Sequence, residues 1–381
     1  MITPDRALRG RYVIAGIGAT AFGSLGCDTL TLHAAACARA LSDANIGKDL
    51  IDGVFVKAPT SAKEFMYGQR VADALGIVPR WGGAWDQGGA ANITLIAFAI
   101  MAIEHGQCDV ALVTYADNPR SGSRAFYERA RGDDASYGWF AAMGGYAMLQ
   151  RRHMIEYQTP REAFGAVALA ARRHGAANPH AQLQRPLTME QYLASPALVD
   201  PIHRDDACLL SDGAGAVVVM SAQRARQLNV PAAVPILGFG EGQTSFDLTR
   251  RASLTSTQAV HSGRMAFDMA GVSANDIDVA QLYDCFTITV LMTLEDYGFC
   301  KKGQVAELVK DGAIELGGAL PINTSGGLLS ETGMPGMQLI HEGVRQIRGS
   351  ANLQVPSADL CLISNQGGVM HTHSTLILGS A

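Results

Sequence analysis

Apolar runs of two kinds alternate along the first 120 residues. Short, continuous apolar segments at Tyr12–Gly18, Val54–Lys57 and Asp109–Thr114 predict buried strands. Residues Thr29–Ala44 carry apolar side chains at helical spacing, whereas Ile93–Gly106 is apolar almost throughout, so we expect one amphipathic and one buried helix. Strands that alternate with helices in this way favour a largely parallel sheet with helices on both faces.

The pattern changes between residues 119 and 199. Polar and aromatic residues become more frequent there, helical segments predominate, and no clear strand candidate remains. This region is typical of a large helical excursion that covers one end of a sheet. The sheet resumes at the apolar segment Gly213–Met220.

A second series of elements repeats roughly the same order. These are a strand at Val234–Gly240, a helix at Ser256–Ala270, a strand at Asp278–Tyr283, a helix from Thr287, a glycine-rich loop at Asn323–Gly336, a helix ending near Ile347, and strands at Asp359–Ser364 and Thr375–Leu378. The repetition predicts a duplicated α/β architecture. We expect an N-terminal half at residues 1–118 and 200–232, a covering region at 119–199, and a C-terminal half at 233–381.

Composition excludes several classes of protein. The chain has 381 residues, 48% of them hydrophobic, which suffices for a large core. A net charge of -5 without a dense Lys/Arg run argues against nucleic acid or an anionic membrane surface as the main partner. The first ten residues lack the apolar core of a signal peptide, and Ile93–Ile103 is too short to span a bilayer. The seven cysteines are widely spaced without a CxxC pair, which indicates a reduced, cytoplasmic chain without a structural zinc site.

Several motifs together carry a family resemblance. They are YDCFTIT at 283–289 with LEDYGFCKKG at 294–303, NTSGGLLS at 323–330, RH at 173–174 with NPHA at 178–181, SDGA at 211–214, and the Gly pair at 367–368. In this order and spacing they resemble the thiolase superfamily, in particular its sterol-carrier-protein-X-type and bacterial lipid-transfer-protein branch. That branch has a His-Asp-Cys-Phe signature, to which Tyr283–Phe286 is similar, and the match extends over nearly the whole chain.

The resemblance implies a thiolase fold, which is a duplicated five-layer αβαβα arrangement with a helical covering region. It also implies a homodimer and a thioester site where the two halves meet. Coenzyme A would enter as part of an acyl-CoA substrate, and no covalently bound cofactor is expected. Members of this branch often associate with a small OB-fold, zinc-ribbon protein, so such a partner is expected here too.

Three catalytic positions of a thiolase differ in this chain. The nucleophilic cysteine at the start of the central helix aligns with Gly89 or Ala90. The Gly-His-Pro histidine aligns with Thr332 or Gly333, and the second cysteine aligns with Asn365. Without a thiol that can form an acyl-enzyme, thiolysis is disfavoured.

Backbone groups that polarise a carbonyl are expected to survive these changes. The amides of Gly88, Gly89, Ala90 and Ala91 should face the pocket at a helix N-terminus, which favours an oxyanion. Gly367 and Gly368 can offer a second set of donors.

Side chains near the motifs complete the predicted site. Tyr283 is the candidate acid or base if its pKa is lowered, although a buried tyrosine held by one hydrogen bond is the alternative. His371 and His373 share one face if their segment is extended, as in a proton relay, and a metal pair there lacks a third ligand. The remaining pocket candidates are Asp284, Asn323, Glu331 and Asn365.

The leading functional hypothesis is a lyase that cleaves a β-hydroxyacyl-CoA by a retro-aldol reaction, with a steroid or other bulky acyl chain. Such a cleavage needs a base for the β-hydroxyl proton and stabilisation of a thioester enolate, but no cysteine nucleophile. Tyr283 and the amides of residues 88–91 meet these needs. Two alternatives remain: a thiolase-like acyltransferase on β-ketoacyl-CoA, and a non-catalytic subunit that binds acyl-CoA or lipid.

Overall fold

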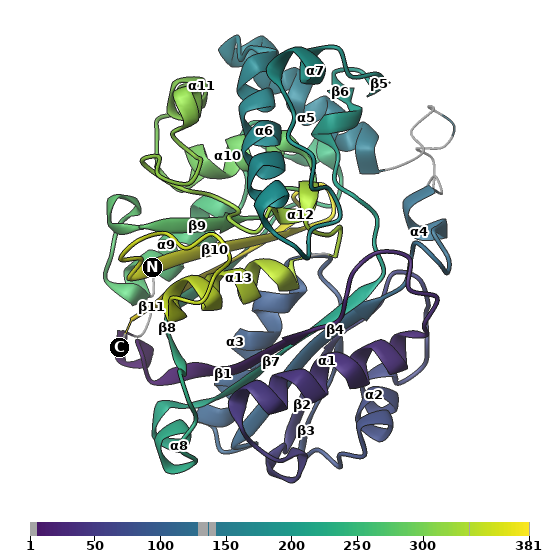
Figure 1. The fold of residues 1–381 in the computed structure, drawn as a ribbon, viewed down its shortest axis with the longest axis vertical. Coiled ribbons are helices and arrows are strands. Elements are labelled where there is room, and N and C mark those ends of the chain that lie inside the picture. The colour runs from purple at the N-terminus through teal and green to yellow at the C-terminus, as the bar shows by residue number, and fades with distance from the viewer. Residues whose placement is uncertain (1–5, 129–135, 137–141, 335, 381) are drawn as a thin grey trace.

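A mixed nine-stranded sheet runs through the molecule (Figure 1). The computed structural model describes residues 6–128, 136, 142–334 and 336–380. Within them, the strands are ordered β3-β2-β4-β7-β1-β8-β11-β10-β9. Their bounds are β1 Tyr12–Ala19, β2 Gly53–Lys57, β3 Trp81–Trp85, β4 Val110–Asp117, β7 Gly213–Ser221, β8 Val234–Gln243, β9 Val279–Leu282, β10 Leu360–Gly367 and β11 Thr372–Gly379.

The prediction of a largely parallel sheet is wrong. Parallel pairing joins β3 to β2, β2 to β4, and β9 to β10. In contrast, β7 is antiparallel to β4 and β1, and β8 is antiparallel to β1 and β11. The last two strands, β10 and β11, form an antiparallel hairpin, because the turn between them is too short for a crossover helix.

Helices fill three layers around the two halves of the sheet, which confirms the five-layer αβαβα arrangement. The bounds are α1 Thr29–Ala44, α2 Tyr67–Leu75, α3 Ala91–Glu104, α9 Ala259–Ala270, α10 Thr287–Asp296, α12 Gly327–Ser330 and α13 Met337–Arg348. The central layer holds α3 and α13, each of which contacts strands of both halves. On the outer faces, α1 and α2 pack on the first half and α9 packs on β8 and β11.

The region at residues 119–199 is mostly helical, as expected. It contains α4 Ala125–Glu128, α5 Ala142–Tyr157, α6 Arg161–Ala177 and α7 Met189–Leu193. The last three helices gather at one end of the molecule, over the C-terminal half (Figure 1). The expectation that no strand occurs there is wrong, because β5 Ala197–Val199 pairs with β6 Ile202–His203.

Other predicted elements occur with shifted ends. The helix expected from Ser256 begins at Ala259, and the last strand begins at Thr372 instead of Thr375. The edge strand β3 was not predicted, because its sequence WGGAW lacks the alternation of a half-buried strand. Among the described residues, no helix combines the length and the apolar character that crossing a bilayer requires.

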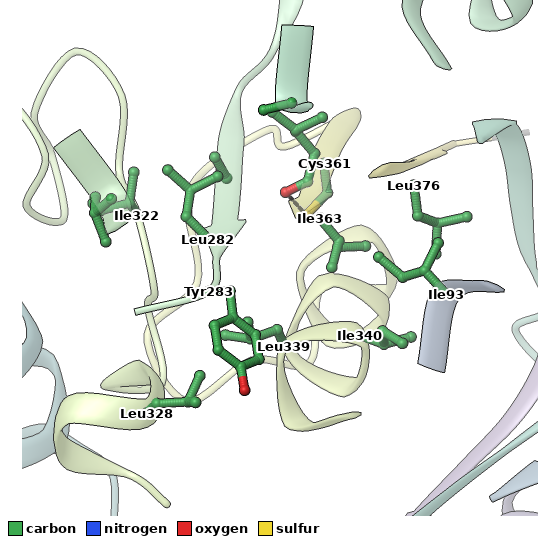
Figure 2. Close-up of a cluster of buried hydrophobic side chains, with 14 of the residues drawn as sticks. Ile93, Leu282, Tyr283, Ile322, Leu328, Leu339, Ile340, Cys361, Ile363 and Leu376 are labelled. Atoms are coloured by element: carbon green, nitrogen blue, oxygen red, sulfur yellow. Dashed lines mark hydrogen bonds between the residues drawn. The ribbon is translucent and has the colours of Figure 1, made fainter. Parts of the chain in front are cut away.

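Two clusters of buried side chains form the core. One lies between α1 and the strands of the first half. The larger cluster surrounds the central layer, where Ile93 of α3, Ile340 of α13 and Ile363 of β10 pack together (Figure 2). Tyr283, directly after β9, lies at the edge of this cluster (Figure 2). The core therefore fixes α3 and the end of β9 next to each other.

Candidate active site

The loop that leads into α3 packs against the end of β10. Gly88 has a left-handed backbone with φ of 60°, and its amide donates to Oδ1 of Asp86 at 2.9 Å. A Cβ atom at Gly88 would lie 2.7 Å from Cα of Gly367, and one at Gly367 would lie 1.8 Å from the carbonyl oxygen of Gln87. Only glycine permits this approach of the two backbones. The glycines predicted for the two oxyanion segments are thus brought together.

The ring of Tyr283 occupies the space that a side chain at position 89 would need. A Cβ atom at Gly89 would lie 2.3 Å from Cε2 and 2.6 Å from Cζ of Tyr283. The backbone amide of Tyr283 donates to the carbonyl of Ser364 at 3.0 Å, which continues the β9–β10 pairing and fixes the ring. The carbonyl oxygen of Gln366 would also lie 2.6 Å from this Cβ atom, so both the Tyr283 ring and the β10 backbone restrict position 89 to glycine.

Tyr283 is a neutral phenol in the free protein. The side chain is 9% exposed, and no hydrogen bond joins its hydroxyl to another described residue. Burial, followed by the nearby Cys285 and Tyr146, raises the pKa of Tyr283 well above its usual value of 10. The hydroxyl is thus available as a hydrogen-bond donor, whereas a base at this position needs a stabilised phenolate.

A network of hydrogen-bonded side chains, which the sequence did not predict, lies beside Tyr283. Nε2 of Gln366 donates to Sγ of Cys285 at 3.0 Å and to the hydroxyl of Tyr146 at 2.8 Å. The hydroxyl of Tyr146 also donates to the carbonyl of Gly368. Tyr146 belongs to α5, so this hydrogen-bond network connects the covering region to the C-terminal half. The position of Gln366 directly before the predicted Gly367–Gly368 pair was the signal available in the sequence.

Asp284 and Asn323 hold the backbone of the site. Asp284 is fully buried and accepts from the amides of Leu328 at 2.7 Å and Leu329 at 3.3 Å, at the start of α12. Burial raises the pKa of Asp284 to about 7. The side chain of Asn323 bonds to the amide and the carbonyl of Leu282 at 2.7 and 2.9 Å. Both side chains thus join the 283–286 signature to the glycine-rich loop.

Glu331 lies at the end of α12, and Asn365 contacts the residue that precedes α13. Glu331 accepts from the hydroxyl of Ser325 at 2.7 Å, and burial raises its pKa to about 7. Nδ2 of Asn365 donates to the carbonyl of Gly336 at 3.2 Å, while its buried Oδ1 has no hydrogen-bond partner among the described residues. An amide at this position cannot perform the acid–base chemistry of a thiol.

The two predicted histidines do not form a pair, which corrects the expectation of a shared face. His371 lies in the turn before β11, where its ring stacks on Phe246 and its Nε2 is 2.7 Å from the carbonyl of Phe246. His373 lies inside β11, is buried, and its Nε2 is 2.7 Å from Oγ of Ser364. Burial lowers the pKa of His373 to about 3. The described residues contain no cluster of three or more His, Cys, Asp or Glu that would suit a metal ion.

Comparison with known proteins places these features in context. Residues 240–380 match the family model described as thiolase C-terminal domain-like. A steroid side-chain-cleaving aldolase of Thermomonospora curvata is 36% identical, over 98% of this chain and 99% of that protein. A 17-hydroxy-3-oxo-4-pregnene-20-carboxyl-CoA lyase of Mycobacterium tuberculosis is 35% identical, over 98% of this chain and all of that protein.

A solved structure agrees with the sequence comparisons. The fold is similar to that of a chain described as an Ltp2-ChsH2(DUF35) aldolase, with a TM-score of 0.88 and 35% identity. The match covers 98% of each chain. The covering region and both halves are therefore all included in the similarity.

Proposed function

The chain belongs to the thiolase superfamily, in its sterol-carrier and lipid-transfer branch, and we propose that it is a lyase that cleaves a β-hydroxyacyl-CoA by a retro-aldol reaction. The observation that carries this function is the contact between Gly89 and the ring of Tyr283. Position 89 is one of the two that align with the thiolase nucleophile, so this contact supports a site that has a phenol in place of covalent acyl transfer. The names of the two relatives given above support a steroid or similarly bulky acyl group.

The reaction needs no thiol nucleophile. The β-hydroxyl loses its proton, the bond between the α and β carbons breaks, and the electron pair enters the thioester enolate. A carbonyl compound leaves, and protonation of the α carbon gives the shorter acyl-CoA. Because the amide of Gly88 is already bonded to Asp86, we assign the enolate oxygen to the amides of Gly89 and Ala90 at the start of α3.

Two groups can handle the protons: Tyr283, which lies beside Gly89, and Cys285, which is hydrogen-bonded to Gln366. We assign the β-hydroxyl proton to the phenolate form of Tyr283, which burial makes the minor form in the free protein and whose ring lies against Gly89. Burial raises the pKa of Cys285 well above its usual value, so this thiol keeps its proton. Its hydrogen bond from Gln366 orients it, and we assign to Cys285 the protonation of the enolate carbon.

The test is turnover of a β-hydroxyacyl-CoA without added coenzyme A. We expect a carbonyl product and a shorter acyl-CoA, and we expect Tyr283→Phe to lower kcat by about 100-fold or more with little change in KM. Tyr157→Phe is the matched control, because its hydroxyl contacts Thr255 away from Gly89. Cleavage of a β-ketoacyl-CoA that depends on free coenzyme A would instead establish an acyltransferase. Tight acyl-CoA binding without turnover of either substrate would establish a binding subunit.

We also propose that the chain forms a homodimer through β3. This edge strand is exposed, with Trp81 51% and Trp85 44% accessible. Beside it, β3 and α3 line an apolar groove of about 460 Å³ that includes Phe98 and Met101. An exposed apolar edge strand is a ready site for pairing with another chain, and a second copy offers the same strand.

A small partner protein is part of the same proposal. The similar solved structure is described as containing a DUF35 component. This supports a DUF35-type, OB-fold and zinc-ribbon partner for the present chain, and activity should be assayed with and without it. All seven cysteines are free, which supports a reducing compartment such as the cytoplasm.

A further inference from the structure

The side-chain amide of Gln366 is held in one orientation. Its Oε1 accepts from the backbone amide of Met370 at 3.0 Å, and a backbone N–H can only donate, so the side-chain oxygen lies on that side. Its Nε2 therefore faces the hydroxyl of Tyr146 at 2.8 Å and Sγ of Cys285 at 3.0 Å. Each of the two N–H groups of the amide then has one acceptor. Gln366 is thus a donor to the sulfur and does not accept the thiol proton.

Tyr146 fixes the same direction from the covering region. It belongs to α5, is buried, and its ring centre lies 4.5 Å from that of Phe286. Its hydroxyl donates to the carbonyl of Gly368, with Oε1 of Gln366 at 3.1 Å as a second acceptor. The hydroxyl oxygen is left to accept from the amide of Gln366. The covering region therefore holds this amide with its other N–H group directed at Cys285.

The thiol proton of Cys285 has no partner within the described part of the chain. Sγ of Cys27 and Sγ of Cys361 each donate to a carbonyl, whereas Sγ of Cys285 only accepts. Burial raises the pKa of Cys285, so the proton stays on the sulfur, and the hydrogen bond from Gln366 acts in the opposite direction because it favours the thiolate. The S–H group is therefore free to face a substrate.

Gln366 also connects this thiol to the start of α3. A Cβ atom at Gly89 would lie 2.6 Å from the backbone carbonyl oxygen of Gln366 and 2.3 Å from the Tyr283 ring. The backbone of Gln366 thus contacts the residue whose amide is assigned to the enolate oxygen, while its side chain contacts Cys285. Cys285 and Tyr283 are 8% and 9% exposed, but Gln366 is 1% exposed. The two groups assigned to the protons therefore reach open space, and the amide beside them does not.

We propose that Gln366, held by Tyr146, is a positioning residue that directs the thiol proton of Cys285 to one face of the enolate. This inference rests on the proposed retro-aldol function. The S–H bond breaks as the electron pair of the enolate forms the new C–H bond, and the thiolate that remains accepts the N–H of Gln366. Solvent then returns a proton to Cys285 and removes the one that Tyr283 took from the β-hydroxyl. The cycle needs no oxidant or other co-reactant.

Deuterium reports the face on which the α carbon is protonated. The substrate is a β-hydroxyacyl-CoA with a methyl group on its α carbon, which gives propionyl-CoA. In heavy water the thiol of Cys285 carries deuterium, so the product carries one deuterium at its α carbon. For the wild-type enzyme we expect the two configurations in a ratio of roughly 10:1 or higher. NMR of the propionate, as an ester of a chiral alcohol, measures this ratio.

Two variants remove the parts of this arrangement separately. Gln366→Met removes the donor and keeps a side chain of similar length, and Tyr146→Phe removes only a hydroxyl. In both we expect kcat to fall about tenfold and the ratio to approach 1:1. Cys285→Ala should have the same effect, and adding Gln366→Met to it should change little, because the two residues act through one proton. Gln227→Met is the matched control, since Gln227 is exposed and accepts from Arg224 away from the site.

An unchanged ratio in Gln366→Met or Tyr146→Phe, even with a lower kcat, would show that these side chains only support packing, and would overturn the inference. A further loss when Gln366→Met is added to Cys285→Ala would do the same. In both outcomes the wild-type enzyme still cleaves the substrate, and the proposed function stands. A wild-type enzyme that cleaves no β-hydroxyacyl-CoA would overturn the proposed function and this inference with it.

A readout without turnover tests the direction of the hydrogen bonds. The S–H stretching band in a Raman spectrum moves to lower wavenumber when a thiol donates a hydrogen bond. The chain has seven cysteines, and the difference between wild type and Cys285→Ala isolates one band. We expect this band at the position of a thiol that donates no hydrogen bond. A band at lower wavenumber would show that the thiol proton is bonded inside the protein, which contradicts the inference.

Discussion

At the scale of single residues, the tyrosine at position 283 restricts which residue can stand at position 89. The sequence showed that the thiolase cysteine is absent and that Gly89 or Ala90 replaces it. It did not show why glycine is needed, because the ring of Tyr283 comes from the other half of the chain. Asp284 and Asn323 were likewise predicted as pocket residues from their positions in motifs. Their bonds to backbone amides and carbonyls become visible only once the buried neighbours are known.

Restoring the cysteine should therefore not restore a thiolase. In Gly89→Cys, the new side chain and the ring of Tyr283 compete for the same space, so we expect lyase kcat to fall at least about tenfold. The free energy of unfolding should fall by about 1–3 kcal/mol, as is typical of overpacking. Urea denaturation and assays with both substrate types check this, with Gly47→Ala as the control because the space around Gly47 is open. Thiolysis by Gly89→Cys with Tyr283 in place would contradict the steric argument.

At the scale of elements, the short helix α12 depends on a carboxyl group that prefers to be protonated. Asp284 accepts from two amides at the start of this helix, and burial raises its pKa from 3.8 to about 7. The folded state therefore holds this proton more tightly than the unfolded state between these two values. The contribution to stability is fully present below about pH 4 and is lost as pH rises to about 7.

Asp284→Asn should flatten this part of the stability curve. Asparagine keeps an acceptor for the amide of Leu328 but does not titrate, so wild type should lose stability relative to the variant between pH 4 and 7. The difference should reach a few kcal/mol, because one pKa unit corresponds to about 1.4 kcal/mol. Urea denaturation at several pH values measures it, and the exposed Asp49→Asn should follow the wild-type curve. Equal slopes for wild type and Asp284→Asn would show that Asp284 does not cause the pH dependence.

At the scale of the whole molecule, the duplicated layers were predictable and the strand directions were not. Alternating strands and helices predicted the two halves, and the helices α3 and α13 occupy the central layer between them. The rule that consecutive strands run parallel applies to uninterrupted strand–helix–strand units. Here the covering region separates β4 from β7, so β7 enters the sheet in the opposite direction. The edge strand β3 was missed because two glycines and two tryptophans replace the usual alternation.

Charges on β3 should prevent association of two copies. In the double variant Trp81→Lys, Trp85→Lys, we expect the molar mass in solution to fall to that of one chain, because paired strands would bring like charges together. Sedimentation equilibrium of the wild type and the variant checks this, and circular dichroism should show an unchanged fold. Val78→Lys is a suitable control, since Val78 is exposed but precedes the strand. A dimer that persists in the double variant would place the interface elsewhere.

The contact between Gly89 and Tyr283 also has an evolutionary meaning. Two of the four glycine codons are one nucleotide away from a cysteine codon, so a single mutation can introduce a thiol at a glycine. With Tyr283 in place the new side chain finds no room, and the backbone carbonyl of Gln366 crowds the same position. A lineage that loses Tyr283 first gives up its proposed proton acceptor and still keeps the carbonyl in the way. A single mutation therefore does not suffice to place a working thiol at position 89.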